Sequence, residues 1–287
     1  MLKYIMTFCI HYGGTMSKKL TTVTKAHYVK LVYRSLLLII GIAFYIFQKV
    51  TTGADVNFNN FGFTPDQFGF ETVLLWVIFI VYFVEMVLRL FPSKIDSMGC
   101  QKMFAKNYEP TGRTKIVNVQ WWRTFIVATI WIGGNSIIGV LHLLGILDAG
   151  ILFILSLAFG VGDMICILFY CPFHSVFFRN RCCSDCRIYN WDFAMMFTPF
   201  AFMLNNWYTG ILFALSMIIL ARWEITYKVH PERFSYNTNK CVDCAHCPEK
   251  LCTHKRQLAG YLKKHRSRFK PVENDAEKSK DDTPIYR

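Results

Sequence analysis

Charged residues are scarce in this chain. Asp, Glu, Lys and Arg make up 18% of its 287 residues, whereas soluble globular domains contain about 25%. Acidic residues are scarcer than basic ones, with 19 Asp and Glu against 32 Lys and Arg. Apolar residues fill the difference and reach 53% of the chain. This composition argues against an ordinary soluble domain and indicates an integral membrane protein.

Several enzyme and cofactor motifs are also absent. The chain has no phosphate-binding Gly-rich loop ending in Lys-Ser/Thr, no His-Glu-x-x-His and no Gly-x-Ser-x-Gly. ATP-driven transport, zinc proteolysis and serine hydrolysis therefore lack their usual residues. Haem is disfavoured because there is no Cys-x-x-Cys-His and only His142 lies in an apolar stretch. No nucleic-acid module accompanies the net charge of +13, so no nucleic-acid partner is expected.

Six stretches are apolar and long enough to be membrane spans, since a helix needs about 20 residues to cross a ~30 Å hydrocarbon core. The sequence predicts an all-α integral membrane protein, a bundle of about six transmembrane helices with a small Cys-rich cytoplasmic region. The spans are placed near residues 31–47, 72–91, 124–147, 151–170, 191–204 and 207–227. The fifth is short, and Pro199 is expected to kink it, with neighbouring helices satisfying the freed backbone groups.

Basic residues predict the orientation of these spans. Outer connections carry Lys49 and no other Lys or Arg. The inner connections carry Lys94, Lys102, Lys106, Arg113, Lys115, Arg123, Arg179, Arg181 and Arg187. Because Lys and Arg concentrate on the cytoplasmic side of membrane proteins, the chain is predicted to be a multi-pass protein of the plasma (inner) membrane with both termini in the cytoplasm.

Four regions follow from this topology. Residues 1–30 form a cytoplasmic N-terminus, 31–227 the six-helix transmembrane domain, 228–270 a basic Cys-rich cytoplasmic region, and 271–287 a polar, disordered tail. Met16-Ser17-Lys18-Lys19 is typical of a natural start, so residues 1–15 are predicted to be upstream sequence.

Eight of the eleven cysteines form two tight groups on the predicted cytoplasmic side. The inner-loop group is Cys171, Cys182, Cys183 and Cys186, and the tail group is Cys241, Cys244, Cys247 and Cys252. Disulfides are rare in the cytoplasm, so dense cysteines there favour metal binding or redox chemistry. Four thiols per group is the number that a tetrahedral zinc or a four-iron cluster requires.

The tail group reads Cys241-Val-Asp-Cys244-Ala-His-Cys247-Pro-Glu-Lys-Leu-Cys252 and resembles a ferredoxin-type cluster loop. The resemblance implies a 4Fe-4S cluster, although the bacterial run has three residues before its fourth cysteine and a proline after it. Zinc is the alternative, because structural zinc joins two Cys-x2-Cys pairs. Such pairs occur at Cys183/Cys186 and Cys241/Cys244, and His246 and His254 can replace thiolates.

Ionisable residues inside spans are costly and mark candidate functional sites. Asn135 and Asp163 are equally distant from the turn at Ala149, so at ~1.5 Å per residue they reach the same depth and can meet. Glu85, Arg222 and Arg34 reach a similar depth. The result is a mixed layer in which Glu85, Asp163 and Glu224 face Arg34, Arg89 and Arg222. Within it Glu85 and Arg89, four residues apart on one helical face, can pair. Asp163, Asn135, Glu85 and Arg222 are the candidate catalytic or transport residues; bundle-locking ion pairs are the structural alternative.

Three functions remain open from the sequence. The first is an iron–sulfur electron-transfer module that passes electrons to a membrane acceptor such as a quinone, or to a redox partner subunit. The second is an ion or small-solute transporter whose inner loops are held by structural zinc, with Asp163, Asn135 and Arg222 along the path. The third is a non-catalytic assembly subunit.

Overall fold

The computed structural model describes residues 22–52, 70–92, 98–116, 121–178, 186–204 and 206–243. Within these ranges the chain is helical, and its one strand-like pairing is an isolated bridge between Pro110 and Asn239. Five helices are long and apolar enough to cross a membrane. They are α2 (Thr22–Thr52), α3 (Phe70–Arg89), α5 (Trp121–Leu143), α6 (Ala149–Leu168) and α8 (Trp207–Val229). The all-helical class and five of the six predicted apolar helices are thereby confirmed.

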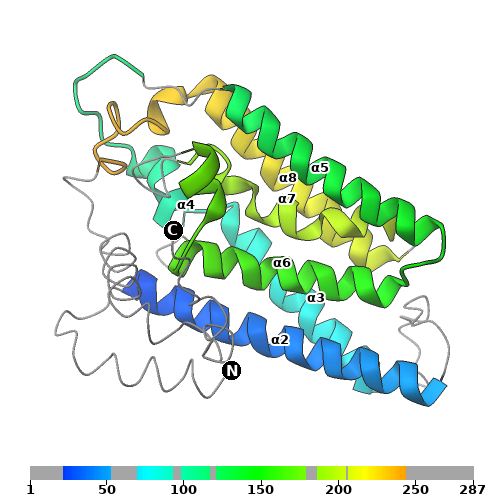
Figure 1. The fold of residues 1–287 in the computed structure, drawn as a ribbon. Coiled ribbons are helices and arrows are strands. Elements are labelled where there is room, and N and C mark those ends of the chain that lie inside the picture. Colours follow the sequence, from blue (N-terminus) through cyan, green and yellow to red (C-terminus); the bar gives the residue numbers. More distant parts are fainter. Residues whose placement is uncertain are drawn as a thin grey trace, which may run out of the picture.

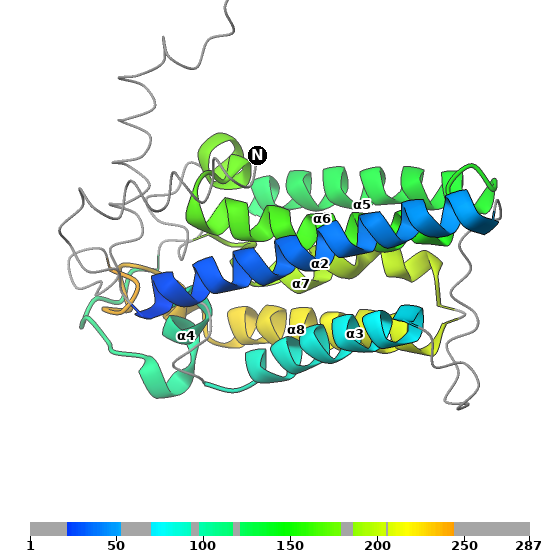
Figure 2. The ribbon, with the colours of Figure 1, turned by 90° about the horizontal axis from the view of Figure 1, so that it is seen from below.

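The long helices lie side by side in one bundle (Figure 1). Helix α6 packs along α2 on one side and along α7 on another, while α8 packs against both α7 and α3. Figure 2 shows α7 in the middle of this arrangement. Short helical elements complete the described chain: α4 (Met98–Met103), η3 (Ala105–Asn107), η4 (Phe173–Phe178), η6 (Tyr189–Trp191), α7 (Asp192–Phe197), η7 (Thr198–Phe202) and η8 (Pro231–Arg233).

The stretch predicted as a fifth span, 191–204, is not a membrane-length helix. It consists of α7 followed by the 3₁₀ helix η7, and the change occurs at Thr198, directly before Pro199. Proline cannot continue an α-helix without losing a backbone hydrogen bond. The Thr198 hydroxyl bonds back to the Ala194 carbonyl at 2.6 Å and accepts the Trp131 indole N–H at 3.1 Å. The Thr198 side chain thus bonds to the backbone of the broken segment, and the neighbouring helix α5 bonds to that side chain.

Helices α5 and α6 form a hairpin whose turn is specified locally. Gly145 has φ of +74°, the left-handed conformation that commonly ends a helix. Three residues on, the Asp148 carboxylate caps α6 by accepting the Ile151 backbone N–H at 2.9 Å. We call the end of the bundle that contains this turn the Asp148 end. Helix α6 runs from there to Leu168, at the opposite end of the bundle.

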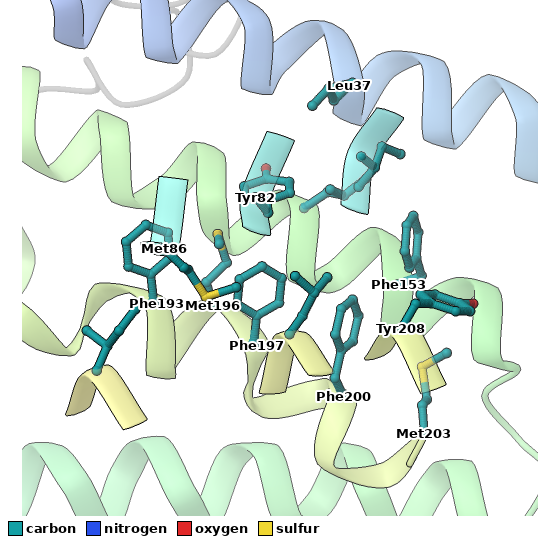
Figure 3. Close-up of a cluster of buried hydrophobic side chains, with 14 of the residues drawn as sticks. Leu37, Tyr82, Met86, Phe153, Phe193, Met196, Phe197, Phe200, Met203 and Tyr208 are labelled. Carbon is teal, nitrogen blue, oxygen red and sulfur yellow. The ribbon is translucent and has the colours of Figure 1, made fainter. Parts of the chain in front are cut away.

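The main hydrophobic core surrounds the broken segment (Figure 3). Phe197 meets Tyr82 of α3 edge to face at 5.5 Å, and Phe200 stacks on Phe153 of α6 at 5.8 Å. All four rings are at most 5% exposed. The shortest of the bundle-crossing segments is therefore its most enclosed.

The chain after α8 folds back onto the segment that follows α3. Asn239 is fully buried, and its amide donates to the carbonyls of Lys102 and Arg233. Backbone bonds from Thr111 to Thr238 and from Lys240 to Glu109 fix the same contact. Figure 1 shows the chain after α6 and the chain after α8 at the same end of the bundle. We call it the cysteine end, because Cys171 follows α6 and Cys241 lies in the chain after α8.

Candidate functional site

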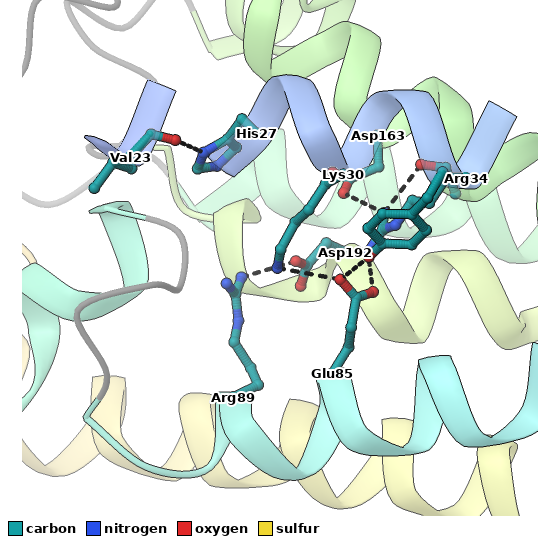
Figure 4. A network of polar contacts seen from close by, with 10 residues as sticks. Val23, His27, Lys30, Arg34, Glu85, Arg89, Asp163 and Asp192 are labelled. Carbon is teal, nitrogen blue, oxygen red and sulfur yellow. Dashed lines mark hydrogen bonds and ion pairs between the residues drawn. The ribbon is translucent and has the colours of Figure 1, made fainter. Parts of the chain in front are cut away.

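A buried ion network links three of the long helices to α7 (Figure 4). Its members are Lys30, Arg34, Glu85, Arg89, Asp163 and Asp192. Arg34 of α2 is its centre: the guanidinium donates to Glu85 of α3 at 2.7 Å and to Asp163 of α6 at 3.3 Å. It also donates to the Gly160 carbonyl at 3.0 Å. The side chain is only 3% exposed, so these acceptors replace water around the charge.

Glu85 has further partners on α2. Lys30, one turn before Arg34, approaches it at 3.2 Å, and the Tyr33 hydroxyl donates to it. Arg89, the predicted same-face partner of Glu85, donates to Asp192 at the start of α7, at 2.8 Å. Both α3 side chains thus have partners on other helices, Glu85 on α2 and Arg89 on α7.

The network is balanced in charge. It contains the three cationic side chains of Lys30, Arg34 and Arg89 and three carboxylates. The ring of Phe193 lies between the two guanidinium groups, 6.0 Å from that of Arg34 and 5.9 Å from that of Arg89. A set of compensated, hydrogen-bonded charges is what burial of ionic groups requires.

Beside this network lies a cavity of about 230 Å³. Its walls come from α5, α6, η4, α7 and the residues that precede η6. They include Asp163 and Asp192 of the network, together with Cys166, Cys171 and Cys186. The remaining lining is apolar or aromatic and includes Trp131, Phe159, Phe173, Met195 and Met196. Carboxylates, thiols and a hydrophobic surface therefore meet at one place.

The other predicted polar candidates lie apart from this site. Asn135 is buried, but its amide donates to the Trp131 carbonyl at 3.0 Å and makes no hydrogen bond to Asp163. Arg222 is exposed and donates to the Leu90 carbonyl. Glu224 pairs with Arg187 and accepts the Trp191 indole N–H at 2.6 Å. The structure brings together Glu85, Asp163, Arg34 and Arg89, but not these three.

Sequence reasoning missed two members of the site. They are Asp192 and Cys166, which belong neither to the predicted charged layer nor to the two predicted cysteine groups. A count of charges signals Asp192: without it, the network has one cation more than it has carboxylates. Cys166 lies three residues after Asp163, on the same face of α6, which is the spacing that aligns helical side chains.

Three of the eight predicted metal ligands lie within the described residues. Cys171 and Cys186 line the cavity, whereas the Cys241 thiol donates to the Asn107 carbonyl at 3.2 Å. Cys182, Cys183, Cys244, Cys247 and Cys252 fall outside those residues, as does the predicted upstream segment 1–15. In the part of the chain that is described, no three His, Cys, Asp or Glu side chains form a group that could hold a metal ion.

Arg187 holds the chain before η6 against α8. Its guanidinium pairs with both Glu224 oxygens and lies 3.8 Å from the ring centre of Tyr227 on α8. Cys186 and Ile188, on either side of it, are buried. This contact ties the chain before η6 to α8 and so positions Cys186 in the wall of the cavity.

The comparisons with known proteins assign no family: no family model, curated protein or solved structure matches this chain. The function is therefore argued from the site alone.

Proposed function

We propose that this chain is a multi-pass membrane protein that crosses the bilayer six times, with the cysteine end in the cytoplasm. Five crossings are the long apolar helices, whose outer faces expose residues such as Ile132 and Ile137 of α5. The sixth is the broken segment of α7 and η7, which returns the chain from the cysteine end to the start of α8. Irregular backbone is tolerated at membrane depth where protein encloses it, and this segment is enclosed.

The function that we propose is electron transfer from the cytoplasm to a membrane acceptor or a partner subunit. The observation that carries it is the cavity, where Cys171 and Cys186 of the inner-loop group share a wall with Asp163. The four tail thiols, from Cys241 to Cys252, would hold an iron–sulfur cluster of the 4Fe-4S type, which supplies one-electron chemistry. Zinc in the same thiols is the structural alternative.

The chain's own residues would serve the proton side of this reaction. Asp163 pairs with Arg34 and lines the cavity, and Asp192 pairs with Arg89 and lines it as well. A carboxylate that is held by an arginine and borders a cavity can first take up a proton and then pass it to a ligand there, while the arginine keeps it oriented. An acceptor that takes up two electrons and two protons would then receive both at this cavity.

The decisive experiment is the metal and acid-labile sulfide content of anaerobically purified protein, with its absorption spectrum. We expect matched iron and sulfide and a visible chromophore. Replacing Cys244 and Cys247 together by Ser should abolish the chromophore, while Cys100→Ser, outside both groups, should keep it. A spectrum that survives the double replacement, or a wild-type protein without iron, would refute the electron-transfer proposal.

The second candidate is a transporter with zinc-stapled loops, and the position of Asp163 beside a cavity favours it. Colourless protein with stoichiometric zinc would point to it. Asp163→Asn should then stop proton flux into liposomes that contain a pH-sensitive dye, while Asn135→Ala, whose side chain does not contact Asp163, should keep it. Equal flux in wild type and Asp163→Asn would remove Asp163 from a transport mechanism.

A further inference from the structure

The cavity is smaller than the pockets that hold drug-sized ligands. Pockets for drug-sized ligands measure about 300–1,000 Å³, and this one measures about 230 Å³. Trp131, Phe159 and Phe173 supply aromatic surface, and the methionine thioethers of Met195 and Met196 add adaptable apolar contact. Such walls suit a flat, methylated ring better than a polar solute.

The charged groups of the cavity are two carboxylates, which accept hydrogen bonds. Asp192 uses one carboxylate oxygen to accept from Arg89 at 2.8 Å. Its other oxygen, Oδ1, is buried and has no hydrogen-bond partner among the described residues. A buried carboxylate oxygen without a donor is costly, so a ligand hydroxyl toward which the Asp192 side chain turns gains affinity.

The charge balance selects a neutral ligand. Because the network already pairs three cations with three carboxylates, a cationic ligand would bring a charge that the network does not compensate. A neutral ring with hydroxyl groups satisfies both conditions: it donates to Asp192 and leaves the charge unchanged. An acyl chain would fill the same walls but has no donor for the carboxylate.

We propose that this cavity binds the ring of a quinone-type molecule and prefers its reduced, dihydroxy form. The inference rests on the proposed electron-transfer function, for which it names the membrane acceptor. Reduction adds two electrons and two protons to the quinone, and both hydroxyl groups appear only in the product. By linkage, a tenfold preference for the reduced form raises the potential of the bound couple by about 30 mV. Such a site draws electrons toward its ligand.

The first test fills the cavity. Gly162 lines it, and a Cβ at that position meets nothing within 4 Å, so Gly162→Leu places a side chain in open space. Gly133→Leu is the matched control, because Gly133 also has open space but lies on the exposed face of α5. Binding of trimethylhydroquinone and trimethylbenzoquinone, which lack a tail, is measured anaerobically by equilibrium dialysis of detergent-solubilised protein. We expect Gly162→Leu to weaken hydroquinone binding by more than about tenfold, and Gly133→Leu to leave it unchanged.

The second test reverses the preference. In Asp192→Asn, the side-chain oxygen is required by Arg89, so the amide nitrogen must take the place of Oδ1. The group without a partner becomes a donor, which suits a quinone carbonyl and not a hydroxyl. We expect the ratio of hydroquinone to quinone affinity to fall by about tenfold, the worth of a hydrogen bond to a charged group.

The outcomes separate this inference from the proposed function. If the purified protein contains no iron but binds hydroquinone, and Gly162→Leu abolishes that binding, the ligand site is supported and the iron–sulfur cluster is refuted. Iron and sulfide without such binding, or with equal binding in Gly162→Leu, would overturn the inference and leave a partner subunit as the acceptor. Tighter binding of tetraphenylphosphonium than of hydroquinone would overturn it as well, because a cation would then be the ligand.

Discussion

Helices α2 and α6 are joined by ions at two places that differ in burial. In the buried ion network, Arg34 of α2 bonds Asp163 and the Gly160 carbonyl of α6, and its side chain is 3% exposed. At the Asp148 end, Lys49 of α2 lies 3.4 Å from Asp148, just before α6, and is 42% exposed. Tyr45 donates to the same carboxylate at 2.8 Å. The partners are similar in type, yet one set is enclosed and the other borders solvent.

The comparison teaches that an ion pair's contribution depends on what happens when one partner is removed. At Lys49, water can replace the lost ammonium, and exposed pairs contribute about 0–1 kcal/mol. At Arg34, no solvent can replace the guanidinium, so its loss leaves uncompensated carboxylates in a medium of low polarity. Buried ion pairs are therefore costly to break although they contribute little net stability when complete.

The largest effect is expected from Arg34→Ala. Glu85 and Asp163 would lose their shared cation, and we expect the free energy of unfolding to fall by about 3–5 kcal/mol. The measurement is SDS-induced unfolding in mixed micelles. A loss no greater than that of Lys49→Ala would show that burial does not distinguish the two places.

A neutral replacement of the whole triad should cost less than this single change. Arg34→Met combined with Glu85→Gln and Asp163→Asn removes the two carboxylates together with their cation. Since replacing a buried ionic group by neutral residues of similar size is often close to neutral, we expect recovery of about half or more of the Arg34→Ala loss. No recovery in the same unfolding assay would mean that Arg34 acts through packing and its Gly160 bond alone.

A smaller effect is expected from Tyr45→Phe. It removes one hydrogen bond to Asp148 and keeps the ring, which should lower the free energy of unfolding by about 1 kcal/mol. Asp148 retains Lys49 and the Ile151 backbone N–H as partners. Tyr33→Phe is the matched change at the buried network, where the hydroxyl donates to Glu85, and should cost more.

The smallest effect is expected from Lys49→Ala, at about 0.5 kcal/mol or less. The effect should shrink further in high salt, because exposed charges are screened. Measuring the midpoint of thermal unfolding at low and high salt tests this. A loss of several degrees that does not depend on salt would contradict this prediction, because an exposed ion pair is screened by salt.

Much of the fold could be predicted from local sequence. Apolar length predicted six spans, of which five are long helices. The turn residue Asp148 falls between two predicted spans, whereas Gly145 lies inside the first of them. Equal depth along the helices correctly placed Glu85, Asp163 and Arg34 in one layer, because helical rise is fixed at ~1.5 Å per residue. Depth does not specify which way a side chain faces, and so Asn135 reached the predicted level without meeting Asp163.

The sequence by itself determined the all-helical class, the five helices long enough to cross a membrane and the level of the charged residues along those helices, since these depend on composition and on distances along one chain. Tertiary structure decided the rest. It paired Arg89 with Asp192, enclosed the broken segment around Pro199, and placed Cys171 and Cys186 at a cavity with two aspartates. These outcomes depend on which helix faces meet, and that is set by packing among elements far apart in the chain.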